Sequence, residues 1–264
     1  HEPRPLVPRE RPPVIQPRSD WAAPAATLML NEAHVGRNME EVQPGDIEEL
    51  LILEVLPAPV HFGTGNDALG GGHNLRRVVG RVPVEEDGSA KFEVPALRAL
   101  VLVAMDGEGR EVKRMNSFVT LMPGEQTACV GCHEQRTLAP PPVTGTMPLA
   151  MAKDPAHPRG YEGVPDIIDF NRDIQPILDK KCKKCHNHEK SPNGVQLTGE
   201  RYVVFSDSYR SLKRPWNVRM GGTNTKPYTT GTASSKLITI LSEGHKDVEL
   251  TEREMNVFRM WVKT

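Results

Sequence analysis

The sequence is poor in aromatic residues and lacks a long apolar run or an excess of charge of one sign. Aromatic residues make up only 5% of the chain, which leaves room for a bound apolar group to supply interior surface. No apolar run approaches the roughly 18 residues needed to cross a bilayer, so no membrane span is expected. The formal net charge of -1 gives no basic field, so nucleic acid is not an expected partner.

Cysteine is also scarce, and its placement is informative. All four cysteines fall in two C-x-x-C pairs, each followed directly by a histidine, whereas a secreted disulfide scaffold would scatter them. The motif residues are Cys129, Cys132 and His133 in the first, and Cys182, Cys185 and His186 in the second.

Three kinds of chemistry use a C-x-x-C pair, and haem attachment explains both motifs best. A zinc ribbon usually places about 15 to 20 residues between its two pairs, whereas 49 residues separate Cys132 from Cys182. A thioredoxin-like dithiol needs one motif and no adjacent histidine. In a c-type cytochrome each thiol adds to one vinyl group of a porphyrin, a spacing of three lets one helical turn reach both, and the imidazole binds iron. The sequence therefore predicts two c-type haems.

Composition divides the chain into four parts. Residues 1–24 form a Pro-rich extended strap, residues 25–139 a β-rich haem c domain, residues 140–166 a second Pro-rich linker, and residues 167–264 an α-helical cytochrome c domain. The predicted fold class is α+β, with a small antiparallel β-sandwich followed by mostly helical structure. Because the chain begins at His1 with neither Met nor a signal segment, we read it as a mature chain or a piece of a longer one.

Local patterns support the two structured parts. An apolar run over residues 50–56 predicts a buried strand, and alternating residues around Asp87-Gly88 predict a hairpin. One apolar face over residues 170–178 predicts a helix that runs into Cys182. Two further helices are predicted, one over residues 235–243 that ends at Gly244, and one that begins at a capping box of Thr251 and Glu254.

The second haem needs a ligand on its other face. His245 is our choice because it follows Gly244 between two predicted helices that could fold across the ring. A solvated loop imidazole is the plain alternative, Met220 is the other candidate ligand, and His188 lies too close to the motif to reach the far face.

The first haem has several candidates. His73 is ranked first. It and His61 flank a Gly-rich loop at residues 62–72 that could close over a porphyrin or could simply be a flexible sandwich loop. This loop lacks the G-x-x-x-x-G-K-[ST] order of a nucleotide site. His34, Met115 and Met122 are further candidates. Five-coordinate iron that admits a small-molecule ligand is another option.

A basic cluster precedes and interrupts the second motif. It consists of Lys180, Lys181, Lys183 and Lys184. It could steer an acidic redox protein toward the second haem, or it could be an ordinary solvated face.

Several blocks of sequence resemble the hydrazine synthase alpha-subunit family. They are residues 11–18, 79–96 and 113–125, the first C-x-x-C-H motif, and residues 170–178 before the second. The resemblance implies a haem-bearing, mostly β middle domain followed by a bis-His cytochrome c domain, in a planctomycete-type dihaem protein whose amino-terminal β-propeller this chain lacks. The family's catalytic member is understood to bind the first iron through a Tyr, with the motif His turned toward zinc. No Tyr lies between His133 and the boundary prolines, and Tyr161 is the nearest downstream, so His133 is read here as an ordinary proximal ligand.

Three functional hypotheses follow. The first is a dihaem cytochrome that passes electrons between two haems and a redox protein partner or a larger cytochrome complex. The second is an enzyme that acts on a small nitrogen or peroxide substrate at an open first haem, with the second haem as relay. The third is a docking fragment of a larger assembly. Because thioether attachment takes place where the chain is exported, the expected location is a bacterial periplasm or an equivalent compartment.

Overall fold

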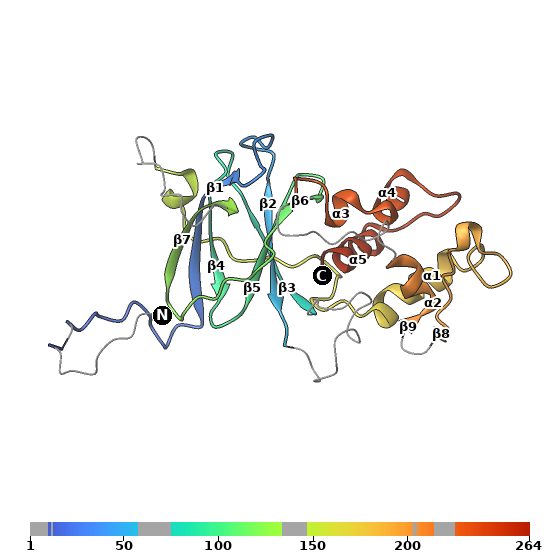
Figure 1. Ribbon diagram of the computed structural model, residues 1–264, viewed down its shortest axis with the longest axis horizontal. Coiled ribbons are helices and arrows are strands. Elements are labelled where there is room, and N and C mark those ends of the chain that lie inside the picture. The colour runs from blue at the N-terminus through green and yellow to red at the C-terminus, as the bar shows by residue number, and fades with distance from the viewer. Residues whose placement is uncertain (1–9, 12, 58–74, 134–146, 203–204, 214–224) are drawn as a thin grey trace, which may run out of the picture.

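A computed structural model describes residues 10–11, 13–57, 75–133, 147–202, 205–213 and 225–264. Strands fill the first half of the chain and helices the second, which confirms the predicted α+β class (Figure 1). The strands of the first half are β1 Ala25–Gly36, β2 Glu49–Val55, β3 Arg76–Pro83, β4 Ala90–Pro95, β5 Leu100–Met105, β6 Glu111–Arg114 and β7 Gln126–His133.

Two sheets pack face to face in this half. One has the strand order β4-β1-β7 and the other has the order β3-β2-β5-β6. Buried side chains from both sheets form one core between them, with Leu28 and Phe92 on the first sheet facing Leu50 and Leu102 on the second. This arrangement is a β-sandwich.

The four-stranded sheet is buried on both of its faces. Leu50 and Ile52 of β2 face the sandwich core, whereas Leu51 and Leu53 face away and pack with Met260 of the last helix, α5. All six residues of β5 are buried for the same reason. A strand covered on both faces needs apolar residues at every position. The run of four apolar residues 50–53 therefore reflects contacts on both faces of β2, one with the sandwich core and one with the helical half.

The expectation of a wholly antiparallel sandwich is wrong. Strand β1 pairs with β4 antiparallel but with β7 parallel, with Leu30 opposite Cys129. The chain leaves β1, passes through strands of both sheets, and returns to β7 in the same direction. Parallel neighbours require such a long connection, and the local alternation of residues carries no information about it.

The predicted hairpin at Asp87-Gly88 is also wrong, although the turn forms. Gly88 has a φ of +85° and donates to the carbonyl of Glu85 at 2.8 Å. The flanking strands β3 and β4 then enter different sheets. Val84 on one side of the turn bonds to Glu48, and the Gly88 carbonyl on the other accepts from Ala33 of β1. The turn therefore joins the two layers of the sandwich.

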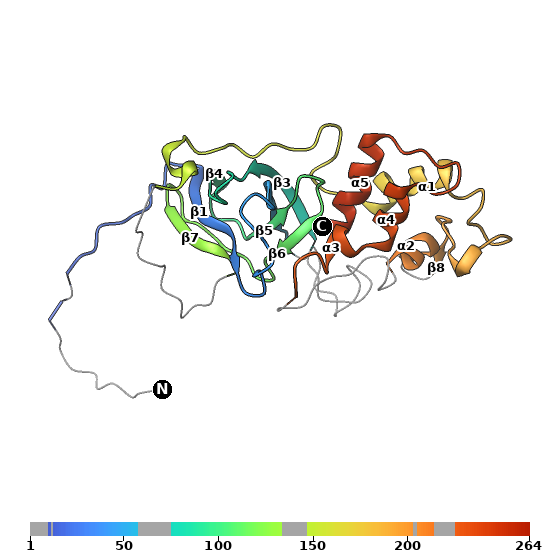
Figure 2. The ribbon, with the colours of Figure 1, turned by 90° about the horizontal axis from the view of Figure 1, so that it is seen from above.

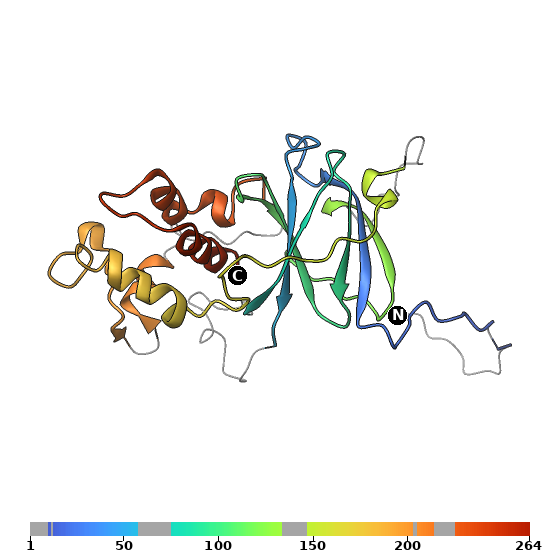
Figure 3. The same ribbon diagram turned by 180° about the vertical axis from the view of Figure 1, so that it is seen from behind.

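The segment after the first helical turn closes one side of the sandwich. This turn, η1, spans Leu149–Ala152. Beyond it, Ala156 donates to Lys91 of β4 at 2.9 Å, and Arg159 donates to Arg81 of β3 at 3.0 Å. Because β4 and β3 are edge strands of the two sheets, the segment covers both edges (Figure 3).

The second half is built from short helices that lie beyond the four-stranded sheet (Figure 2). They are η2 Phe170–Ile174, α1 Gln175–Lys181, η3 Pro192–Gly194, α2 Asp207–Leu212, α3 Gly231–Ser234, α4 Lys236–Glu243 and α5 Glu252–Lys263, with a small hairpin of β8 Arg201–Tyr202 and β9 Phe205–Ser206. The predicted helix before Cys182, the helix end at Gly244 and the capping box of α5 are all confirmed.

A buried polar network joins the two halves. Glu111 of β6 is fully buried, and its carboxylate accepts from Arg114 and from the Thr230 hydroxyl. Lys263 at the end of α5 is also buried and donates to the Gly109 carbonyl at 2.8 Å. Within the described residues, no helix is long and apolar enough to cross a membrane.

Candidate functional sites

The second motif lies on a turn that continues α1. Cys182 caps the helix and donates to the Leu178 carbonyl at 2.9 Å, and both Cys185 and His186 donate to the Cys182 carbonyl at 3.1 Å. The three motif side chains therefore leave one tight turn. Here the structure has the local geometry that the spacing of three predicts for sulfur attachment.

His186 and His245 face each other across a pocket. Their ring centroids are 6.1 Å apart with an interplanar angle of 33°. Two imidazole nitrogens that bind one transition-metal ion, each at about 2 Å, hold their ring centres about 6 Å apart. His186 Nδ1 donates to the Val195 carbonyl at 3.1 Å, which leaves Nε2 for a ligand bond. The spacing of the two rings therefore fits two ligands of one metal ion.

The pocket around these rings fits a flat apolar cofactor. Its volume is about 470 Å³, within the roughly 300–1,000 Å³ typical of ligand sites. Apolar side chains from three helices line it, including Leu178, Leu241 and Phe258, together with Cys182 and Cys185. Burial raises the pKa of the Cys182 thiol.

Neither of the other two histidine or methionine candidates weighed for this site is seen beside it. His188 Nε2 lies 3.0 Å from Glu200 Oε2, so it pairs with that carboxylate. Met220 is outside the described residues. Lys181 of the basic cluster turns inward to Glu254, whereas Lys180, Lys183 and Lys184 are exposed.

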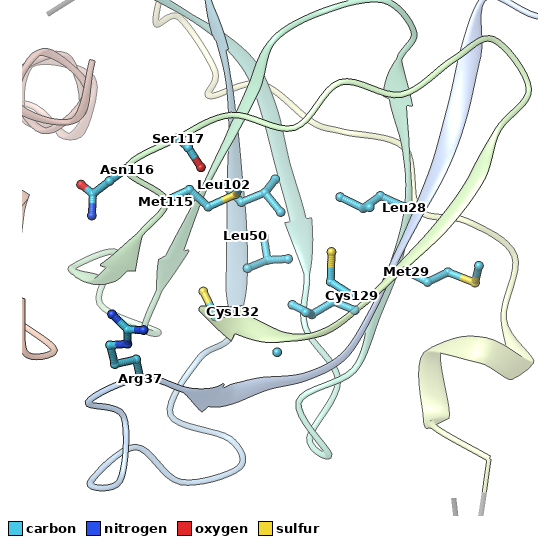
Figure 4. Close-up of a pocket in the computed structure, with 12 residues that line it drawn as sticks. Leu28, Met29, Arg37, Leu50, Leu102, Met115, Asn116, Ser117, Cys129 and Cys132 are labelled. Carbon is cyan, nitrogen blue, oxygen red and sulfur yellow. The ribbon is translucent and has the colours of Figure 1, made fainter. Parts of the chain in front are cut away.

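The first motif lies on strand β7, so the expectation of a helical turn there is wrong. Cys129 and Cys132 are both in the strand, yet both line one cavity of about 460 Å³ between the two sheets. Their sulfur atoms point to the same side (Figure 4). The lining also includes Leu28, Leu50, Leu102 and Met115.

An irregular strand explains how both thiols reach one cavity. In a regular strand, residues three apart point to opposite faces. Here the pairing of β7 with β1 changes register between Glu32 and Gly36. Gly131 lies within this irregular stretch, and a Cβ on it would collide with the Val35 carbonyl. Glycine therefore allows the close approach that turns Cys132 toward the cavity.

Among the described residues, few of the candidate ligands predicted for the first haem line the first cavity. Met115 lines the cavity and is a candidate sixth ligand. His34 is held against the Gly88 turn, and Met122 is partly exposed near the Glu125 carboxylate, so neither is among the lining residues. His61 and His73 lie outside the described residues, as does the side chain of His133, whose backbone belongs to β7.

Tyr161 is remote from the first cavity. It packs on the other face of the four-stranded sheet, where Arg81 lies 4.6 Å from the ring centre. Burial raises the pKa of its hydroxyl to about 12. This tyrosine is therefore separated from Cys129 by the sheet.

Sequence reasoning missed Lys113, which lies near the first motif. Its Nζ donates to the Arg37 carbonyl at 3.1 Å and to the Thr225 carbonyl, and it lies near Cys132. Burial lowers its pKa. No local pattern marks this lysine, because the three segments it joins are far apart in sequence.

Comparisons with known proteins agree with this architecture. Residues 45–134 match the family model of the hydrazine synthase alpha subunit middle domain. This part of the chain is similar to the hydrazine synthase alpha subunit. This match covers strands β2 to β7 and the first motif, and it agrees with the resemblance read from the sequence.

Two members of the hydrazine synthase family illustrate the relationship. Hydrazine synthase subunit alpha of Kuenenia stuttgartiensis is 44% identical over 52 residues, which are 18% of this chain and 6% of that protein. The solved structure of Kuenenia stuttgartiensis hydrazine synthase superposes with a TM-score of 0.67 over 92% of this chain and 43% of its own, at 19% identity. The fold is therefore shared across both halves, and the chain spans less than half the length of these relatives.

Proposed function

We propose that the chain is a dihaem c-type cytochrome module that passes electrons through two covalently attached haems. The observation that carries the proposal is the pair of opposed imidazoles of His186 and His245 in an apolar pocket beside two cysteines. Iron with both axial positions filled exchanges electrons without binding substrate. The chemistry that a haem supplies in this setting is one-electron transfer.

Each residue of the second site has a role in this proposal. Cys182 and Cys185 would tether the porphyrin, and His186 and His245 would hold its iron. The Val195 carbonyl fixes the orientation and tautomer of His186. Leu178, Leu241 and Phe258 exclude water from the ring, and a dry site stabilises the less charged reduced state.

The first site also has two cysteines and a motif histidine, but no second histidine is described beside it. Cys129 and Cys132 would tether the porphyrin of the first site, and His133, which follows them in the sequence, would bind its iron. Met115 is one of the described lining side chains that could bind this iron, and a Met ligand raises the reduction potential relative to a His ligand. His73 remains the predicted alternative.

A second candidate function is catalysis at the first site. Among the described residues, no histidine lines the cavity that holds Cys129 and Cys132. An iron without a strong sixth ligand could bind a small nitrogen compound or a peroxide, with the second haem as electron relay. The relationship to hydrazine synthase favours this alternative, although the chain spans less than half of those relatives.

The expected surroundings follow from the attachment chemistry. Thioethers form on exported chains, so a bacterial periplasm or an equivalent compartment is proposed. The partner is a redox protein or the remaining part of a larger cytochrome complex.

One experiment tests the proposal and separates it from the alternative. The chain is produced with a cytochrome c maturation system, and its covalently bound haem is counted by mass spectrometry and by haem stain after denaturation. Two haems per chain are expected, with a low-spin oxidised spectrum from the second site. Fewer than two would contradict the dihaem proposal. A fully low-spin protein that ignores cyanide and nitric oxide would remove the enzymatic alternative.

A further inference from the structure

Lys181 connects the helix of the second motif to the start of α5. Its Nζ lies 2.9 Å from Glu254 Oε2 and also donates to the Glu249 carbonyl. The side chains of Lys181 and Glu254 are only 18% and 14% exposed. A charged hydrogen bond that is shielded from water is stronger than an exposed ion pair.

Glu254 is itself held rigidly. It closes the capping box of α5, and its Oε2 accepts from the Thr251 backbone at 2.8 Å. Because the carboxylate is fixed to the helix start, Lys181 gains a rigid anchor on α5.

The loop that carries His245 ends at this anchor. Gly244 ends α4 with a φ of +94°, Lys246 adopts a φ of +54°, and Val248 donates back to the His245 carbonyl at 3.1 Å. Glu249, whose carbonyl accepts from Lys181, follows directly. The loop is therefore held at its amino end by α4 and at its carboxyl end by Lys181.

We propose that Lys181 and Glu254 are positioning residues that hold His245 opposite His186. This inference rests on the proposed function, because the pair would act by keeping both axial positions of the second haem filled. Neither side chain would touch the iron. Loss of the contact would leave the thioether attachment at Cys182 and Cys185 intact while allowing the His245 loop to swing away.

Lys183 provides a matched control. It is the same residue type, lies between the two cysteines of the same motif, and approaches Asp179 at only 3.8 Å with half of its side chain exposed. Exposed pairs of this kind contribute little. Removal of its charge changes the local field of the motif without affecting the His245 loop.

The test measures how readily carbon monoxide replaces the sixth ligand of the reduced second haem. Lys181→Met is expected to raise the apparent affinity for carbon monoxide about tenfold, since one charge-assisted hydrogen bond is lost from the closed state. Lys181→Arg should restore wild-type behaviour, and Lys183→Met should match wild type. The oxidised spectrum should show a high-spin fraction in Lys181→Met alone.

Two further variants keep the test decisive. Glu254→Gln can still close a capping box, so it removes the ionic partner while preserving the helix start. It should raise the apparent affinity for carbon monoxide as Lys181→Met does, and it replaces Lys181→Met in the test if that variant does not fold. His245→Ala is the reference for a fully open site. If His245→Ala binds carbon monoxide while both Lys181→Met and Glu254→Gln behave like wild type, the inference is overturned and the haem assignment stands. If His245→Ala does not bind it, the ligand assignment itself fails, and this inference with it.

Discussion

The two C-x-x-C-H motifs have the same spacing, yet the structure builds them in different ways. The second lies on a turn at the end of α1 and faces a histidine from another loop. The first lies on an irregular β-strand inside a sandwich, and both of its thiols enter one cavity. Among the residues that the structure describes, the two pockets share no lining residue. The same spacing therefore occurs in two different local structures, and the surroundings of each motif determine which side chains lie around it.

The largest expected effect is the loss of one haem from one site. Cys182→Ser with Cys185→Ser should remove the second haem and leave the first attached, and Cys129→Ser with Cys132→Ser should do the reverse. Intact mass and haem staining measure the outcome. If either double variant lost both haems or neither, the sites would not be independent attachment points.

The next largest effect is expected when the candidate second ligand of each site is removed. His245→Ala should convert the second haem from low spin to high spin and make it bind carbon monoxide, because its opposed imidazole is gone. Met115→Leu should change only the first site, by a shift in reduction potential if Met115 is its ligand. Absorption and electron paramagnetic resonance spectra distinguish the two. A low-spin second haem in His245→Ala would show that another residue binds it.

A third prediction concerns the buried polar network around Glu111, which joins the β-sandwich to the helical half. Glu111→Gln leaves Arg114 as a buried cation without its carboxylate, and breaking a buried pair costs about 3–5 kcal/mol. Denaturant unfolding should show this loss. The matched control Glu85→Gln affects an exposed pair with Lys153 and should change stability by less than about 1 kcal/mol. Equal losses of unfolding free energy in the two variants would show that the buried pair stabilises the protein no more than an exposed pair does.

The smallest effect is expected in the pH dependence of stability. Burial lowers the pKa of Lys263 to about 8, below its ordinary value of about 10.4 in an unfolded chain. Between these values the unfolded chain binds more protons than the folded one, so stability should rise with pH from about 8 to about 10. The cost of the buried charge below pH 8 is at most about 3 kcal/mol. Lys263→Met should reduce this rise, which unfolding at several pH values would detect. An unchanged rise would mean that Lys263 is not its source.

Sequence patterns were reliable where a feature depends on neighbouring residues. The α+β class, the helix into Cys182, the helix end at Gly244 and the capping box at Thr251 are local, and all are present. Helix starts and stops are written in three or four consecutive residues. The candidate ligand His245 was chosen for the same reason, since it follows such a stop directly.

Local patterns failed where strands choose their partners. The turn at Gly88 forms, but β3 and β4 enter different sheets, and β7 joins β1 in parallel. Pairing depends on which buried faces meet, and residues far apart in sequence decide that. The polar joint between Glu111 and Thr230 and the contact between Lys181 and Glu254 have no local signal for the same reason.

The sequence by itself determined the chemistry available to this protein, because two cysteines and a histidine in a fixed spacing can be read without a fold. Only the tertiary structure decided that His186 meets His245, that both thiols of a strand motif reach one cavity, and that α5 packs on the four-stranded sheet. Each of these outcomes depends on the distance between segments that are remote along the chain. Packing of buried surfaces sets that distance, and residue order alone does not.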